Sequence, residues 1–191
     1  MTIRALPLFG LLALASLGLC QGRPGVTGTS AGQSIADAIR SAANTDGAFF
    51  PAGSMKDSFS TDNLASAVQY PADEIVIVRL TGSEIRQAFE RSLSLYPQDN
   101  TSFLQVAGFD IEFSASGEPG KRVLNVRVNG GDLNEKGSYS IAMPSSLGRG
   151  GSGYFKIWDK VKITGTVQGA TLESVLKGKR VSESKSRWVQ R

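Results

Sequence analysis

The sequence has no histidine and only one cysteine among its 191 residues. Without imidazole there can be no Ser-His-Asp triad, no histidine general base and no His-ligated metal centre. A single cysteine excludes a disulfide framework and a cysteine-rich zinc site. The rest of the composition, with 40% hydrophobic and 20% charged residues, is typical of an ordinary globular protein with one domain.

Long apolar runs are also scarce, and the longest lies at the N-terminus. Arg4 precedes an apolar stretch from Ala5 to Leu19 that contains one hydroxyl residue, Ser16, and ends near Cys20. A membrane-spanning helix needs about 18 or more apolar residues, whereas this shorter run fits a secretory signal. We therefore expect residues 1–20 to be a signal peptide and the protein to be exported, either to a periplasm or out of the cell. The alternative is a buried N-terminal helix.

Cys20 allows two kinds of processing. The sequence Leu17-Gly18-Leu19-Cys20 resembles a lipobox, in which the cysteine is lipidated and becomes the mature N-terminus. The residue before such a cysteine is usually small, and here it is Leu19, so we favour simple cleavage. Loss of Cys20 would leave a mature protein without thiols, which suits an oxidising compartment.

The remaining chain predicts a flexible leader followed by one α+β domain. Residues 21–32 are rich in Gly, Ser and Thr and show no periodicity, which indicates a flexible leader. In residues 33–191, helical segments flank a block of strands, which is the pattern of an α+β fold. We expect helices over 33–44, 63–68, 82–95 and 169–177, and strands over 48–50, 75–80, 109–113, 124–128, 139–143, 161–167 and 187–190.

Three local signals support these boundaries. The continuous β-branched run over 75–80 predicts a strand buried on both faces. Thr81 and Glu84 have the spacing of a capping box, which places the start of a helix directly after that strand. Asn129-Gly130 predicts a tight turn between strands that each bury one face, as the alternation of Leu124, Val126 and Val128 with polar neighbours shows.

Charge is concentrated at the C-terminus. Residues 177–191 carry six basic residues and one acidic residue, while the whole chain has a formal net charge of +4. A basic terminus can bind nucleic acid or anionic lipid. No reader motif with interleaved aromatic residues accompanies it, so we expect solvated charges around a short terminal strand and no nucleic-acid partner.

The run Gly148-Arg149-Gly150-Gly151-Ser152-Gly153 is the most unusual local composition. Successive backbone amides in such a loop can hold an anion. It is not a P-loop, because no Lys-Ser or Lys-Thr pair follows. The simpler interpretation, which we favour from the residues alone, is a tight connection in which glycines adopt positive φ.

Five short segments, taken together, resemble a known family. They are, in chain order, Leu80-Thr81-Gly82, Phe103-Leu104-Gln105-Val106-Ala107-Gly108, Pro119-Gly120-Lys121-Arg122-Val123, Val128-Asn129-Gly130 and Gly150-Gly151-Ser152-Gly153-Tyr154. This succession resembles the C-terminal domain of the 5′-nucleotidase / UDP-sugar hydrolase family and extends over residues 33–191. The resemblance implies mixed or antiparallel sheets with helices on their outer faces.

The resemblance also implies that catalysis and substrate binding belong to two different domains. In that family an N-terminal metallophosphoesterase domain holds two metal ions with Asp, His and Asn, and the C-terminal domain clamps the base between two phenylalanines. We expect this chain to lack the first domain and therefore to hold no cofactor and no catalytic residue of its own. Hydrolysis would then need a separate metallophosphoesterase partner, and a membrane contact would need a lipid on Cys20.

The expected nucleoside- or nucleotide-binding residues follow from the family pattern position by position. Phe103 matches the first clamp phenylalanine; for this residue, packing in the core is the alternative. The second clamp falls at Ser146, the family's loop carboxylate falls at Ser152, and an arginine of its Asn-Gly-Gly-Gly-Ile-Arg segment falls at Lys56. The loop glycines are Gly150, Gly151 and Gly153, and Arg149 offers a guanidinium plane that could stack on a base.

These substitutions leave open how much of the family's binding is retained. Loss of a stacking face, a carboxylate and an arginine fork would lower affinity by several kcal/mol, since one base–aromatic stack alone is worth about 1–3 kcal/mol. We therefore expect an exported nucleoside- or nucleotide-binding module of nucleotide catabolism. The alternatives are a degenerate structural or interaction domain that binds no nucleotide, and a hydrolase that uses unrelated chemistry.

Overall fold

The computed structural model describes residues 22–191. The expected signal peptide, residues 1–20, and its possible lipidation site Cys20 lie outside the described residues. Within residues 22–191, no helix combines the length and the apolar character that crossing a membrane requires.

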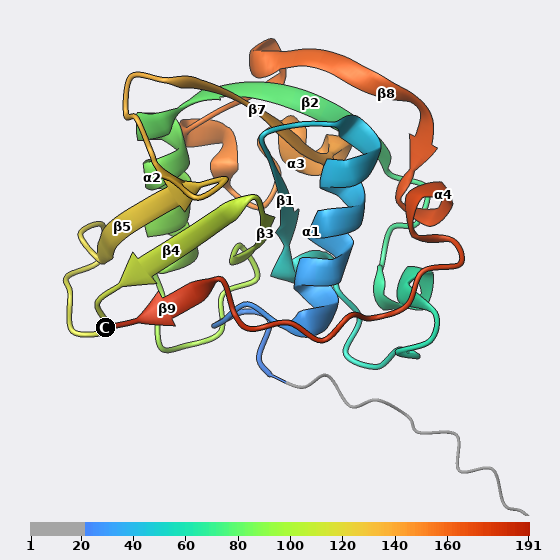
Figure 1. Ribbon diagram of the computed structural model, residues 1–191, viewed down its shortest axis with the longest axis horizontal. Coiled ribbons are helices and arrows are strands. Elements are labelled where there is room, and N and C mark those ends of the chain that lie inside the picture. The colour runs from blue at the N-terminus through green and yellow to red at the C-terminus, as the bar shows by residue number, and fades with distance from the viewer. Residues whose placement is uncertain (1–21) are drawn as a thin grey trace, which may run out of the picture.

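The larger of two sheets has five strands in the order β3-β1-β7-β2-β8 (Figure 1). Strands β1 and β7 run parallel, and the other neighbours in this sheet run antiparallel. The bounds are β1 Gly47–Pro51, β2 Glu74–Thr81, β3 Leu104–Ala107, β7 Ser138–Pro144 and β8 Ile163–Thr171. The β-branched run expected over 75–80 forms β2, which lies between β7 and β8. The predicted burial on both faces is confirmed only in part, because Ile77 is half-buried and Arg79 is exposed.

The smaller sheet has the order β6-β5-β4-β9. Its strands are β4 Phe109–Phe113, β5 Val123–Val128, β6 Gly131–Asp132 and β9 Trp188–Gln190. The C-terminal strand β9 pairs parallel with β4, which confirms the predicted terminal strand. Asn129 and Gly130 have φ values of 51° and 86°, so the predicted tight turn is present and joins β5 to the short β6.

Helices α1 and α2 are longer than two turns, and α3 and α4 are short. Their bounds are α1 Ser30–Ala43, α2 Gly82–Ser92, α3 Ser145–Gly148 and α4 Leu172–Leu176, and single 3₁₀ turns span Ala52–Ser54, Leu64–Ala67, Tyr154–Lys156 and Lys160–Lys162. The capping box at the start of α2 is confirmed. The Thr81 amide donates to Glu84 Oε2 at 2.8 Å, and the Glu84 amide donates to Thr81 Oγ1 at 3.2 Å.

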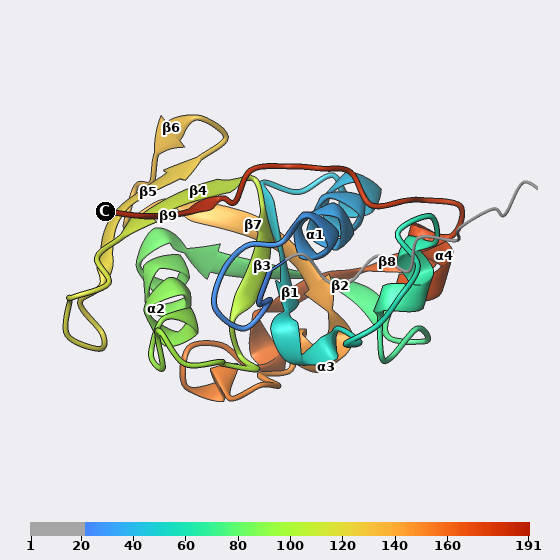
Figure 2. The ribbon, with the colours of Figure 1, turned by 90° about the horizontal axis from the view of Figure 1, so that it is seen from below.

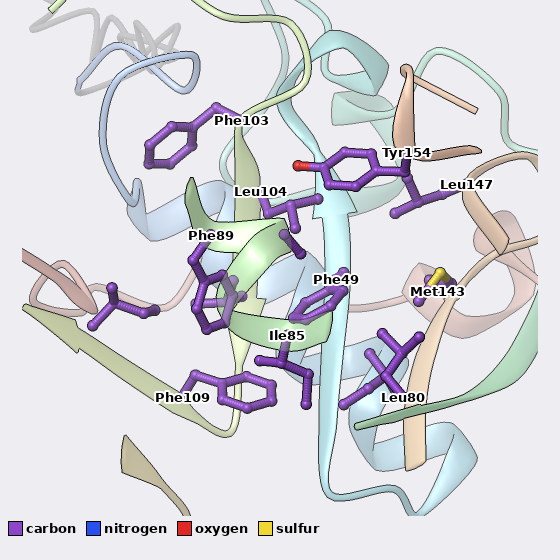
Figure 3. Packing of buried hydrophobic residues seen from close by; sticks show 14 of the residues in the cluster. Phe49, Leu80, Ile85, Phe89, Phe103, Leu104, Phe109, Met143, Leu147 and Tyr154 are labelled. Carbon is purple, nitrogen blue, oxygen red and sulfur yellow. The ribbon is translucent and has the colours of Figure 1, made fainter. Parts of the chain in front are cut away.

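Both faces of β1 are buried, because its side chains alternate between two cores. Ala48 and Phe50 face the core that α1 and α4 cover, together with Ile35, Ile39 and Ile75. Phe49 faces the second core, which α2 and the smaller sheet close. Figure 2 shows α1 and α2 on opposite sides of β1 and β3, and Figure 3 shows Phe49, Phe89, Phe103 and Phe109 gathered in the second core.

The segment before α1 is held against the domain over much of its length. Gln105 Nε2 donates to the carbonyls of Pro24 and Thr27, each at 2.8 Å, and the Asn100 amide donates to the Gly25 carbonyl at 3.0 Å. Thr29 caps α1, which begins at Ser30, earlier than the predicted start at residue 33. The expected leader 21–32 therefore includes an ordered, hydrogen-bonded stretch, because a buried glutamine supplies partners that sequence periodicity does not reveal.

Two apolar side chains from the predicted strands 124–128 and 161–167 are exposed. Leu124 is 54% exposed, because a bulge in β5 changes its pairing with β4 between Glu112 and Phe113. Val161 is 81% exposed, because it lies in a 3₁₀ turn and β8 begins only at Ile163. In both cases a local irregularity interrupts the two-residue period on which the expectation depended.

Candidate functional site

A cavity of about 520 Å³ opens where four chain segments meet beside the larger sheet. Its lining residues are Gly53, Ser54, Tyr70, Thr101, Ser146, Gly151 and Ser152. None of these side chains carries a charge at neutral pH, and five of them have hydroxyl groups. Such a lining is suited to a neutral, hydroxyl-bearing ligand more than to a phosphate.

Backbone hydrogen bonds join the first wall of the cavity. The Gly53 amide donates to the Thr101 carbonyl at 2.8 Å, and the Gln69 amide, next to Tyr70, donates to the Ser54 carbonyl at 3.0 Å. Gly53 is required at this crossing, because a Cβ there would lie 2.9 Å from Thr101 Cβ. The 51–54 segment therefore fixes Tyr70 and Thr101 on either side of the cavity.

The glycine-rich loop forms the opposite wall as a tight connection. The amides of Arg149, Gly150 and Gly151 donate to carbonyls of the preceding residues 145–147 at 2.9–3.0 Å. Gly150, Ser152 and Gly153 have positive φ values of 87°, 52° and 76°. The favoured interpretation of a tight turn is confirmed, and the three bonded amides are already engaged within the turn.

Ser146 is the second residue of the short helix α3 and is hydrogen-bonded to a carboxylate that the sequence did not suggest. Its Oγ donates to Asp73 Oδ2 at 2.6 Å, and its amide lies 3.3 Å from the same oxygen. Asp73 precedes β2 and therefore reaches α3 across the sheet end. No motif marks this aspartate, so only the fold could pair it with Ser146.

Arg91 of α2 fixes the backbone of Ser152, which lines the cavity. Its Nη2 donates to the Ser152 carbonyl at 2.8 Å, and Ser102 Oγ donates to the same carbonyl at 2.7 Å. The guanidinium carbon lies 5.2 Å from the centroid of the Tyr154 ring. Glycine is favoured at position 153, because its φ of 76° is a backbone conformation that L side chains rarely adopt.

Tyr154 lies beneath this wall and is fully protonated at physiological pH. Burial raises the pKa of its phenol well above the usual value, although bonds to Ser92 and the charge of Arg91 act in the opposite direction. Its hydroxyl donates to the Ser102 carbonyl at 2.7 Å. The phenol therefore serves as a buried donor that ties the glycine loop to the Thr101–Ser102 segment.

The structure unites some of the expected binding residues and separates others. Ser146, Gly151 and Ser152 line one cavity, and Gly150 and Gly153 shape the turn that carries them. Phe103 is only 1% exposed and packs against Trp188, with ring centroids 4.7 Å apart. In this arrangement the Phe103 ring offers no face to a ligand, because Trp188 and the core cover it.

Lys56 and Arg149 lie outside the lining of this cavity. Lys56 borders a smaller hollow of about 230 Å³ together with Arg23, Asp57 and Asp99. Arg149 is exposed, and its Nε donates to Ser145 Oγ at 3.2 Å. Neither of these two positively charged side chains therefore lines the cavity.

Tyr70 is the functional candidate that sequence reasoning missed. Its side chain is 58% exposed and supplies the aromatic ring in the cavity lining. It lies between β2 and the 3₁₀ turn Leu64–Ala67, outside every predicted element. The sequence does show an aromatic residue in a connecting segment. Hydrophobic periodicity gives such a residue no role, because it belongs to no helix or strand.

The residues present do not fit a two-metal centre. The sequence contains no histidine, and within residues 22–191 no group of three or more acidic or cysteine side chains is placed to hold a metal ion. The cavity lining offers hydroxyl groups and one aromatic ring.

The chain is similar in sequence to known proteins. Residues 19–160 match the family profile described as "5'-nucleotidase, C-terminal domain". Human 5'-nucleotidase is 32% identical over 108 residues, which are 52% of this chain and 19% of that protein. The trifunctional nucleotide phosphoesterase protein YfkN of Bacillus subtilis is 30% identical over 115 residues, 58% of this chain and 8% of that protein. The chain thus spans less than a fifth of the length of these curated relatives.

A solved structure supports the fold over nearly the whole chain. The crystal structure of a 5'-nucleotidase precursor from Thermus thermophilus aligns with 90% of this chain and 38% of its own chain, with a TM-score of 0.70 and 22% sequence identity. The aligned family region is the C-terminal domain, and the metal site of the family lies in the N-terminal domain. The α+β architecture with two mixed sheets, expected from the sequence, is confirmed.

Proposed function

Because this chain belongs to the 5′-nucleotidase C-terminal domain family, we propose that it is a binding module for nucleosides or nucleotides in nucleotide catabolism. It recognises the nucleoside part of its ligand and performs no phosphate hydrolysis alone. A separate metallophosphoesterase completes the hydrolytic site, and the protein acts after export.

The observation that carries this proposal is the cavity that joins Ser146, Gly151 and Ser152 with the 53–54 segment. These are positions at which the family pattern has its second clamp, its loop carboxylate and its Asn-Gly-Gly-Gly segment. A volume of about 520 Å³ lies within the range of small-ligand sites, which is about 300–1,000 Å³.

Tyr70 supplies a stacking face in place of the clamp rings that are absent. Its ring lines the cavity and is more than half exposed, so one face can meet a purine or pyrimidine base. One base–aromatic stack contributes about 1–3 kcal/mol. The hydroxyls of Ser54 and Thr101 are available to the ribose, while the uncharged lining leaves the phosphate to project outward.

Isothermal titration calorimetry of the purified protein with adenosine, AMP and UDP-glucose tests the proposal. We expect measurable binding of at least one of them, with adenosine bound no more weakly than AMP, because no cation lines the cavity. Failure of a wider panel of nucleosides and nucleotides to bind would contradict it.

A second function, as a structural domain without a ligand, is favoured by two observations. Phe103 is buried against Trp188, and the Ser146 hydroxyl is already bonded to Asp73. This alternative predicts no heat of binding with any nucleotide. A third outcome, release of phosphate from AMP by pure metal-supplemented protein, would contradict both proposals and indicate unrelated hydrolase chemistry.

A further inference from the structure

The loop over residues 155–162 presents large apolar side chains to solvent. Phe155 is 64% exposed and Val161 is 81% exposed, and together with Ile157 they border a shallow hollow of about 290 Å³. In Figure 2 this orange segment, which follows α3, lies at the lower edge of the molecule. Exposed apolar groups that cluster in this way mark a contact with another surface.

The exposure of Phe155 and Val161 is built into the loop, because the residues between them and before them are anchored. Tyr154 and Trp158 are buried and stack with ring centroids 4.6 Å apart. Trp158 Nε1 donates to the Leu147 carbonyl at 2.9 Å. The buried pair fixes the backbone, so that Phe155 cannot turn inward without displacing a core aromatic ring.

The second half of the loop is anchored through polar contacts. Asp159 Oδ1 accepts a hydrogen bond from the Val161 amide at 2.8 Å, which caps the 3₁₀ turn. Lys162 Nζ lies 2.7 Å from Glu84 Oε1 on α2. Val161 is therefore held outward between two fixed residues.

Lysine residues lie next to Phe155 and Val161 in the sequence. The loop contains Lys156, Lys160 and Lys162 against one acidic residue, Asp159. Within residues 22–191, Lys162 is paired with Glu84, and no ion pair involves Lys156 or Lys160. The loop thus combines two outward apolar side chains with two unpaired lysines.

From this combination we propose that the 155–162 loop docks on an anionic lipid surface, with Phe155 and Val161 entering the interfacial region and Lys156 and Lys160 meeting the headgroups. Apolar burial and lysine–headgroup attraction each favour such binding. A second copy of this chain is disfavoured, because its lysines would face like charges.

This docking goes beyond the expectation that only a lipid on Cys20 would bring the chain to a membrane. It is also independent of the nucleoside cavity, since none of Phe155, Lys156, Lys160 and Val161 lines that cavity.

Co-sedimentation with vesicles tests the proposal on residues 22–191, which contain both sheets and both cores. The apolar residues 5–19 are omitted, because they would bind vesicles themselves. We expect binding to vesicles of equal parts phosphatidylglycerol and phosphatidylcholine, and much weaker binding to pure phosphatidylcholine. The double variant Phe155→Ser/Val161→Ser should lower the partition coefficient about tenfold, and Lys156→Gln/Lys160→Gln about fivefold or more.

Matched controls are Leu124→Ser, which removes another exposed apolar side chain, on β5, and Lys136→Gln/Lys177→Gln, which removes two lysines elsewhere. Both should bind like the parent. A loop variant that also binds like the parent would overturn the proposal and assign the attraction to the basic C-terminal segment. Equal binding to neutral and anionic vesicles, or binding only to an acidic soluble protein, would overturn it as well.

A fluorescence measurement gives a readout that does not depend on sedimentation. In Phe155→Trp the new indole should shift its emission to the blue when anionic vesicles are added, since it enters a less polar region. In Leu124→Trp it should not shift. Absence of a shift in Phe155→Trp would contradict insertion of this loop.

Discussion

The ring of Phe103 lies 4.7 Å from the ring of Trp188, centroid to centroid, inside the core that α2 and the smaller sheet enclose. Trp188 reaches this position because β9 pairs parallel with β4, and its Nε1 donates to the Leu104 carbonyl at 3.0 Å. The C-terminal strand lies beyond the matched family region, residues 19–160. A segment outside that region therefore determines that a residue inside it is a core residue in this structure.

Removal of the Trp188 side chain should destabilise the whole domain. Trp188→Ala leaves a cavity beside Phe89, Phe103 and Phe113 and should cost about 3–5 kcal/mol of unfolding free energy. Urea unfolding followed by circular dichroism measures the change. Val189→Ala, at a partly exposed neighbour on the same strand, is the control and should stay within about 0.5 kcal/mol of the parent.

Tyr70→Ala should weaken nucleoside binding without affecting stability. The ring lines the cavity and is 58% exposed, so its removal costs one stacking contact, about 1–3 kcal/mol, and little core packing. Tyr70→Phe keeps the ring and should keep most of the affinity. Calorimetry with adenosine measures both variants, and equal affinities for Tyr70→Ala and the parent would exclude Tyr70 as the stacking residue.

Arg149→Ala should change adenosine affinity less than twofold. The guanidinium is bonded to Ser145 Oγ and does not border the cavity, so its removal leaves the lining intact. The same titration measures this variant, and Ser145→Ala, which removes only the partner hydroxyl, is its control. A loss of affinity in Arg149→Ala alone would show that the arginine turns toward the ligand and stacks on the base.

Domain stability should fall in acid partly through Glu84. Burial tends to raise the pKa of this carboxyl, but hydrogen bonds from Lys162 and Thr81 outweigh it and lower the pKa below the ordinary value of 4.5. Because the folded pKa is the lower one, this contribution is full above pH 4.5 and is lost as the pH falls through the folded pKa.

Chemical denaturation at a series of pH values measures this dependence. Glu84→Gln keeps a side chain that can complete the capping box but removes the titration, so its stability should depend less steeply on pH below 4.5. Parallel curves for Glu84→Gln and the parent would assign the acid sensitivity to other carboxyl groups.

Sequence periodicity was sufficient where a residue's environment depends on its neighbours in the chain. The capping box of Thr81 and Glu84 and the turn at Asn129-Gly130 both involve contacts a few residues apart. It failed at Leu124 and Val161, because a bulge and a 3₁₀ turn change which face a side chain occupies without changing the local composition.

The sequence by itself determined the absence of imidazole chemistry, the α+β class and the family, since these depend on residue types and on the order of short segments. Only the tertiary structure decided which residues share a cavity. Ser54, Tyr70, Thr101 and Ser146 come from four separate segments, and their meeting depends on the register of the larger sheet and on long-range bonds such as Ser146 to Asp73. No local pattern encodes such contacts, because they are fixed by packing of segments that are far apart in the chain.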